Sequence, residues 1–266
     1  MQPLTVSLVQ GATRWHDARA NRDYYAAQVR PLAGSTDLVV LPETFLTGFT
    51  NDTEQQAVPM GSTDVEWLRN LAAEIGAVVT GSLVIEHEGR HFNRLFWMRP
   101  DGSFDTCDKR HLFRMAGEHD HYSAGRERLI VELKGWRICP LVCYDLRFPA
   151  WSRNRRDETA VGGMDYDLLI YVANWPAPRR NAWRTLLRAR AVENLACCVG
   201  VNRVGCDGKG IDYAGDSGVF DARGDTVLEL DDREQVASVC LEPEPMLELR
   251  SKFPAWMDAD EFTLHV

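Results

Sequence analysis

The chain has 266 residues, of which 45% are hydrophobic and 26% are charged, a composition typical of a globular protein with a sizeable core. Its 30 basic and 39 acidic residues give a net charge of -9, which argues against binding to nucleic acids or to a membrane surface. The sequence shows no apolar run of about 18 residues and no basic, apolar leader, so we expect neither a transmembrane helix nor a secretory signal.

The first part of the chain alternates strand and helix patterns. A β-branched run at 4–9 predicts a strand, and residues 17–32 predict a helix that Asp17 caps. The continuous apolar run at 37–41 is typical of a strand buried on both faces. This order of strand, helix and strand indicates the α/β class, in which helices cover a sheet.

Glu43 follows the buried strand directly, within the sequence Leu-Pro-Glu-Thr-Phe. A carboxylate at the end of a buried strand is either paired or functional, because burying an unpaired charge is costly. Taken alone, an exposed loop glutamate or a helix-capping acid is the simpler interpretation of this residue.

Lys109 occupies a similar position further along the chain. The elements predicted before it are a helix at 65–75, a hairpin of strands at 77–85 and 92–98, and a short strand at 104–108. Lys109 follows the end of this last strand, at the start of a loop. Most lysines lie at the protein surface, which is the simpler interpretation of this residue. The polar loop at 114–128 contains Glu118 and has no periodicity of its own, which is often the mark of a functional loop.

Cys143 lies between a predicted strand at 137–142 and a helix predicted from Phe148 to Arg156, with Pro149 in its first turn. Backbone N–H groups in such a turn lower the pKa of a thiol and hold a developing oxyanion, which suits a nucleophile. The alternative is a small core residue, as most free cysteines are.

The second half of the chain continues the pattern. The remaining predicted elements are strands at 129–133, 166–173, 196–204, 219–220, 226–230 and 235–241, and helices at 181–194 and 243–253. Asn174 and Trp175 follow the strand at 166–173, so another strand end supplies polar side chains, as in open α/β sheets. Three basic residues of the helix at 181–194 are expected to face solvent or a partner: Arg184, Arg188 and Arg190. Without repeats or linkers, we expect a single domain over 1–266 with a C-terminal tail at about 243–266.

The seven cysteines are odd in number and include no CxxC pair, which indicates a reduced cytoplasmic protein with free thiols. Cys139, Cys197 and Cys198 are interpreted as packing residues. The loop histidines lack zinc-site spacing with a cysteine pair, so we expect no metal and solvated side chains at His111, His119 and His121. A thiol redox sensor is an alternative, which the missing CxxC disfavours.

Three blocks stand in order along the chain: Leu-Pro-Glu43-Thr-Phe, Asp-Lys109-Arg-His-Leu-Phe and Val-Cys143-Tyr-Asp-Leu-Arg-Phe-Pro. Together they resemble the signature blocks of the nitrilase, or carbon–nitrogen hydrolase, superfamily. The resemblance covers nearly the whole chain and includes Asn174-Trp-Pro and Asn202-Arg-Val. It implies an α/β fold of the nitrilase type, a four-layer α-β-β-α sandwich, and a homodimer or larger assembly formed through helices beside the active site.

The resemblance also implies a mechanism without metal or organic cofactor. Cys143 is then the nucleophile, and Glu43 takes the thiol proton, passes it to the leaving ammonia and later activates water. Lys109 and the backbone N–H of Tyr144 hold the oxyanion of the tetrahedral intermediate, and Asn174 and Trp175 are candidates for binding the substrate. Glu118 matches a second glutamate that the superfamily often has in this loop, with a solvated acid as the alternative.

The blocks around Cys143, around Asn174 and Trp175, and at the C-terminus look most like the bacterial omega-amidase branch. Those enzymes hydrolyse the terminal amide of 2-oxoglutaramate or 2-oxosuccinamate to the dicarboxylate and ammonia, which here would proceed through a Cys143 thioester. A substrate of this kind requires a cation in its pocket, and three arginines are candidates: Arg147, Arg114 and Arg179. An ion pair with a neighbouring carboxylate is the alternative for Arg147.

Two other functions stay open. One is a different amidase of the same superfamily, acting on deaminated glutathione, a carbamoyl compound or a nitrile, which spacing in the sequence does not separate from an omega-amidase. The other is a catalytically idle scaffold, which would have no need to keep Glu43, Lys109 and Cys143 together.

Overall fold

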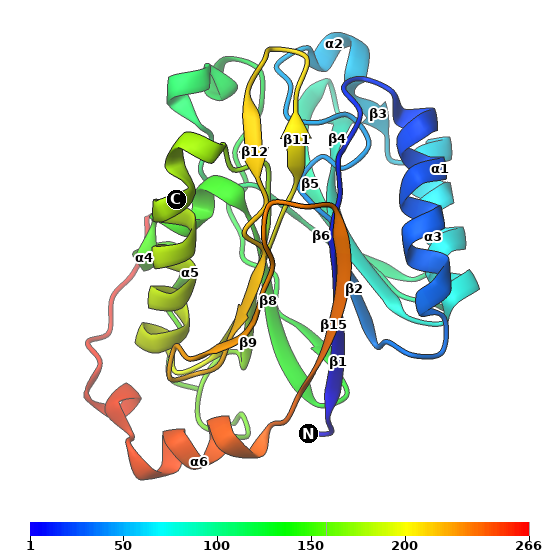
Figure 1. Ribbon diagram of the computed structural model, residues 1–266. Coiled ribbons are helices and arrows are strands. Elements are labelled where there is room, and N and C mark those ends of the chain that lie inside the picture. The colour runs from blue at the N-terminus through cyan, green and yellow to red at the C-terminus, as the bar shows by residue number, and fades with distance from the viewer. Residues whose placement is uncertain (158, 266) are drawn as a thin grey trace.

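Two β-sheets packed face to face form the centre of the computed structural model, which describes residues 1–157 and 159–265 (Figure 1). The first sheet contains, in spatial order, β15 (Gln235–Leu241), β1 (Leu4–Gln10), β2 (Leu38–Val40), β4 (Val78–His87), β5 (Arg90–Met98) and β6 (Phe104–Asp108), with β3 (Val58–Pro59) beside β4. β1, β2 and β4 run parallel, so their C-terminal ends reach the same edge of the sheet.

The second sheet contains, in spatial order, β14 (Thr226–Glu229), β13 (Gly218–Phe220), β10 (Cys197–Asn202), β9 (Leu168–Ala173), β8 (Trp136–Val142) and β7 (Val131–Leu133). β8, β9 and β10 are parallel and bring Cys143, Asn174 and Arg203 to one edge. A separate hairpin of β11 (Val204–Cys206) and β12 (Asp212–Ala214) continues beyond this edge.

Helices cover the outer face of each sheet, which makes four layers (Figure 1). α1 (Ala18–Val29) and α3 (Thr63–Ile75) lie on the first sheet, and α4 (Pro149–Ser152) and α5 (Arg180–Asn194) lie on the second. The remaining helices are α2 (Thr53–Gln56) and α6 (Glu244–Lys252). Short 3₁₀ turns occur at Arg30–Leu32, Arg114–Ala116, Glu118–Asp120, Cys143–Arg147, Ala177–Arg179 and Ala255–Asp258. The predicted α-β-β-α sandwich is therefore confirmed.

Local signals account for the helix boundaries on the first sheet. The Asp17 carboxylate accepts a hydrogen bond from the Ala20 N–H at 2.9 Å and caps α1, as predicted. Ser62 caps α3 in the same way, and Gly76 ends it in the left-handed conformation, at a φ of 68°.

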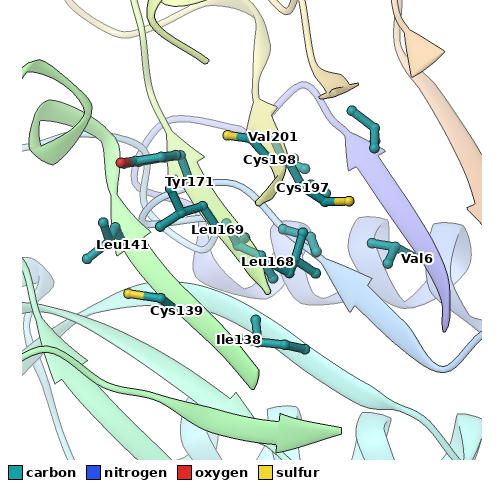
Figure 2. Close-up of a cluster of buried hydrophobic side chains, with 14 of the residues drawn as sticks. Val6, Ile138, Cys139, Leu141, Leu168, Leu169, Tyr171, Cys197, Cys198 and Val201 are labelled. Atoms are coloured by element: carbon teal, nitrogen blue, oxygen red, sulfur yellow. The ribbon is translucent and has the colours of Figure 1, made fainter. Parts of the chain in front are cut away.

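The core between the sheets consists of the apolar side chains of their facing strands. Figure 2 shows Val6 of the first sheet together with Ile138 and Leu168 of the second within this layer, whereas Cys139 and Cys198 point from their strands to the other face of the second sheet. The prediction that Cys139, Cys197 and Cys198 are packing residues is confirmed, because all three are buried. Burial raises the pKa of the Cys139 thiol to about 12, so this group stays protonated and unreactive.

The helix predicted from Phe148 to Arg156 is wrong in its second half, because α4 ends at Ser152. Asn154 explains the difference: its backbone N–H donates to the side chain of Asn194, and its side chain donates to the backbone oxygen of Tyr166. These contacts with distant parts of the chain hold the segment in an irregular conformation that local propensity does not encode.

Arg190 is also a correction, because it does not face solvent with Arg184 and Arg188. Its side chain is buried and donates at 2.6 Å to the backbone oxygen of Leu146, which belongs to the turn that begins at Cys143. A buried arginine at this position ties α5 to that turn. No helix within residues 1–157 and 159–265 combines the length and the apolar character that crossing a membrane demands.

Candidate active site

Glu43, Lys109 and Cys143 meet between the two sheets, although 66 residues separate Lys109 from Glu43. The Nζ atom of Lys109 lies 2.9 Å from Oε1 of Glu43, and the charge of the same carboxylate acts on the Cys143 thiol. Their exposed fractions are 0% for Glu43, 1% for Lys109 and 8% for Cys143. The three residues that the sequence singles out at strand ends therefore form one buried cluster, with Cys143 as its most accessible residue.

Glu118 joins this cluster from the loop between β6 and β7. Both of its carboxylate oxygens lie 2.9 Å from Nζ of Lys109, and the Phe113 N–H donates to Oε2 at 2.5 Å. The alternative of a solvated acid is wrong, because Glu118 is 0% exposed. The long loop turns back through two 3₁₀ turns at Arg114–Ala116 and Glu118–Asp120, which place this carboxylate inside the protein.

One ammonium therefore serves two buried carboxylates. Burial opposes the charge on Lys109, but the adjacent Glu118 and Glu43 carboxylates outweigh it, so its pKa lies well above the ordinary value. Burial also raises the pKa of Glu118, and the nearby charge of Glu43 adds to this rise, against the opposing effect of Lys109. The ammonium stays charged and joins the two acids.

Cys143 opens a 3₁₀ turn that runs to Arg147, and its φ of 44° places it in the left-handed region. A non-glycine residue rarely adopts this conformation, and residues that do so often lie at functional sites. The expectation that the turn lowers the pKa of the thiol is wrong. Burial raises this pKa well above its ordinary value and the Glu43 carboxylate raises it further, so the resting group is a protonated thiol that needs a base.

Two asparagines hold the Glu43 carboxylate. The Asn93 side chain donates to Oε1 at 2.8 Å, and the backbone N–H of Asn174 donates to Oε2 at 2.8 Å. The Asn174 side chain donates to the Glu43 backbone oxygen at 2.8 Å and to the Thr44 hydroxyl at 2.9 Å. Sequence reasoning identified Asn174 but missed Asn93, whose one signal is a polar side chain inside a strand of mostly apolar residues.

Asp145 links the segment after Lys109 to the segment before Cys143. One oxygen accepts from the backbone N–H of His111 at 2.9 Å and lies 2.8 Å from its Nδ1, and the other accepts from the Val142 N–H at 3.2 Å. The His111 ring also stacks on Phe148, with ring centroids 3.7 Å apart. The prediction that His111 is a solvated loop residue is therefore wrong.

We expect Asp145→Asn to lower kcat about 10- to 100-fold, because small displacements of reacting groups are costly. The asparagine amide has the size of the carboxylate, but its NH₂ group would face the backbone N–H of His111 or Val142, so that two donors oppose each other. This should also lower the free energy of unfolding by about 1–3 kcal/mol. Steady-state kinetics and urea unfolding measure both effects. Asp165→Asn is the control, since Asp165 pairs with Arg128 away from the cluster. A folded Asp145→Asn variant with the kcat of the wild type would contradict this role.

A pocket opens beside Cys143, and most of its lining is apolar. Phe49, Phe113, Tyr144, Trp175, Ile211 and Tyr213 contribute its aromatic and aliphatic walls. Lys109 and Asn174 also line it, so the pocket connects the buried cluster with the surface. Trp175 is held by its backbone N–H, which donates to Asn202 at 2.8 Å, and by its ring N–H, which donates to the Arg179 backbone oxygen at 2.9 Å.

Two arginines line the same pocket. The guanidinium of Arg147 lies 4.9 Å from the Trp175 ring centroid, and that of Arg179 lies 5.3 Å from the Phe113 ring centroid. Among residues 1–157 and 159–265, neither arginine forms an ion pair with a carboxylate, so the predicted alternative for Arg147 is not found. Arg114 is exposed and does not line the pocket.

The described part of the chain contains no group of three or more His, Cys, Asp or Glu side chains arranged to hold a metal ion. The chemistry available in this pocket is that of a thiol, a carboxylate that can accept its proton and an ammonium that can stabilise negative charge.

Comparison with known proteins places this chain in a family. Residues 5–248 match the family model described as carbon-nitrogen hydrolase. The chain is 44% identical over 265 residues to the omega-amidase YafV of Escherichia coli (strain K12), covering 99% of this chain and 100% of that protein. It is 31% identical to a 2-oxoglutaramate amidase of Bacillus subtilis (strain 168), covering 84% of each.

A solved structure agrees with these sequence matches. It is a CN-hydrolase superfamily protein from Xanthomonas campestris with an arsenic adduct in its active site, 53% identical, with a TM-score of 0.97 and 100% coverage of both chains. The resemblance stated from the three sequence blocks is thus confirmed: the chain belongs to the carbon–nitrogen hydrolase, or nitrilase, superfamily.

Proposed function

We propose that this hydrolase cleaves the terminal amide of a small 2-oxo dicarboxylate monoamide, 2-oxoglutaramate or 2-oxosuccinamate, to the dicarboxylate and ammonia. The names of its relatives, omega-amidase and 2-oxoglutaramate amidase, support this substrate class. The observation that carries the proposal is the pocket itself, where two arginines without a carboxylate partner among the described residues line the same space as Cys143.

The proposed reaction begins when Glu43 takes the proton of the Cys143 thiol and the sulfur attacks the amide carbon. Lys109 and the backbone N–H of Tyr144 stabilise the oxyanion that forms. Glu43 then gives its proton to the leaving nitrogen, so that ammonia departs and a thioester remains. In the second half, Glu43 takes a proton from water, hydroxide adds to the thioester, and the acid is released with a protonated Cys143.

Glu118 positions Lys109 in this scheme. Nζ has three donors, and its three contacts are one with Glu43 and two with Glu118. The second contact with Glu118 is redundant for holding the ammonium, so one N–H can turn towards the oxyanion. The charge of the ammonium does not change during the reaction.

Arg147 and Arg179 are proposed to bind the carboxylate at the far end of the substrate. A guanidinium presents two parallel N–H donors to a carboxylate, and both guanidinium groups already lie against aromatic rings that restrict their movement. Tyr144 and Trp175 would pack against the short carbon chain, and Asn174 would stay engaged with Glu43.

The test is ammonia release from 2-oxoglutaramate, compared with pentanamide, which has a similar length but no carboxylate. We expect the wild type to prefer 2-oxoglutaramate, and Arg147→Met and Arg179→Met each to raise KM about 10- to 100-fold, the equivalent of one charged hydrogen bond. Arg184→Met, on the exposed face of α5, is the control. Equal rates on both amides, or wild-type KM in both arginine variants, would contradict the proposal and favour another amide or a nitrile.

We also propose, on the family resemblance, that the chain acts as a single domain over 1–266, as a homodimer or larger assembly, and in the cytoplasm. Light scattering of the purified protein measures the assembly, and a monomer at micromolar concentration would contradict it.

A further inference from the structure

Asn93 contacts two members of the buried cluster. It lies in β5, where it pairs with Val84 of β4, and it is 1% exposed. Its side-chain N–H donates to Oε1 of Glu43 at 2.8 Å, and its backbone oxygen accepts from the Lys109 N–H at 2.9 Å. The same residue therefore holds the side chain of Glu43 and the backbone of Lys109.

The hydrogen bond from Asn93 to Glu43 is important because of the net charge of the cluster formed by Glu43, Glu118 and Lys109. Glu43 and Glu118 share one ammonium, so the cluster carries an excess negative charge when all three groups are ionised. A neutral hydrogen-bond donor stabilises a buried carboxylate without adding a charge of its own. Among the described residues, the neutral N–H donors to the Glu43 carboxylate come from Asn93 and Asn174.

These donors also restrict rotation of the carboxylate. Asn93 contacts Oε1 and Asn174 contacts Oε2, so the plane of the group is held from both sides. The shorter Asn174 contact comes from the backbone, which a substitution does not remove. Asn93 is therefore the neutral donor whose contribution a single substitution isolates.

We infer that Asn93 is a positioning residue, whose side-chain amide holds the Glu43 carboxylate in its orientation towards Cys143. This inference rests on the proposed function in one respect, the use of Glu43 as the base that activates the thiol. The titratable groups that face Glu43 from neighbouring elements are Lys109, Glu118, Tyr122, Cys143 and Tyr213. All of them are kept when Asn93 alone is changed.

The experiment uses two variants of the full chain, Asn93→Leu and Asn93→Ala. Leucine has nearly the shape of asparagine and leaves no cavity, whereas alanine leaves one, so an effect common to both variants comes from the lost donor. Two pH profiles are measured: kcat for amide hydrolysis and the rate of Cys143 alkylation by iodoacetamide.

In each profile the rate falls as the pH is lowered, and this part of the curve is its acid limb. We expect the acid limb of both profiles to move to higher pH by about one unit in each variant, because loss of the hydrogen bond favours the protonated form of the Glu43 carboxyl group. At neutral pH, kcat should fall about 10- to 100-fold with a smaller change in KM. Asn154→Ala is the matched control, because Asn154 is also buried and its side chain donates to the backbone oxygens of Tyr166 and Asn194, which do not contact Glu43. It should lose stability and keep the wild-type acid limb.

Acid limbs at the wild-type pH in both Asn93 variants would overturn the inference, even if kcat fell, since a merely structural role lowers activity without moving the limb. The alkylation profile requires no amide substrate. A wild type that fails to hydrolyse 2-oxoglutaramate would therefore contradict the proposed function and leave the test of Asn93 intact.

Discussion

Cys143→Ala is expected to abolish ammonia release, with a loss in kcat on the order of 10⁴- to 10⁶-fold, as found when the nucleophile of a hydrolase is removed. The physical reason is that water would have to attack an unactivated amide in a pocket built around a sulfur atom. The fold should persist, because the side chain loses one atom at the rim of the core and is 8% exposed. Ammonia release and mass spectrometry of the acyl-enzyme measure the two halves of the reaction.

Cys139→Ala is the matched control for this experiment. Cys139 is a buried cysteine of β8 that does not line the pocket, and Figure 2 shows it in a cluster of buried hydrophobic side chains. Its replacement should cost unfolding free energy and leave kcat nearly unchanged. Full activity in Cys143→Ala, or an acyl adduct on another residue, would show that the proposed mechanism is wrong.

Lys109→Met is expected to damage both activity and stability. Loss of one oxyanion donor typically lowers kcat about 10²- to 10³-fold. Loss of the ammonium also leaves Glu43 and Glu118 buried without their counterion, and breaking a buried ion pair costs about 3–5 kcal/mol. Enzyme kinetics and urea unfolding at several pH values measure the two effects.

The stability loss of Lys109→Met should depend on pH. Without Lys109, the folded variant holds the two carboxyl groups in their protonated form more strongly than the unfolded chain does. The folded state then binds more protons, so its stability falls as pH rises and recovers as pH decreases from 8 towards 5. Adding Glu118→Gln should restore part of the stability at neutral pH but not the activity.

The surface lysine Lys134 supplies the control, since its Nζ lies 2.8 Å from Asp37 in a partly exposed ion pair. Lys134→Met should cost less than about 1 kcal/mol and leave kcat unchanged. A Lys109→Met variant as stable as Lys134→Met at neutral pH would contradict the account of one ammonium holding two buried acids.

The sequence by itself was sufficient for most strands of the two sheets, the α/β class and the positions of Glu43, Lys109 and Cys143. It missed β3 and the β11–β12 hairpin, because the single strand predicted at 196–204 divides into β10 and β11. Buried strands are continuous apolar runs, and a polar residue directly after such a run is visible without any structure. The sequence blocks around these residues were also sufficient for the family and for its four-layer fold. The catalytic roles of the three residues stay predictions that the variants above test.

Only the tertiary structure decided how these residues are held and charged. Asn93 reaches Glu43 across 50 residues of chain, and Asp145 reaches His111 across 34, so neither contact leaves a local pattern in the sequence. The end of α4 at Ser152 depends on the contacts of Asn154 with a distant helix, and the raised pKa of Cys143 depends on burial. Local propensity and spacing report on neighbours along the chain, whereas burial, charge balance and hydrogen-bond partners exist only once the two sheets have packed together.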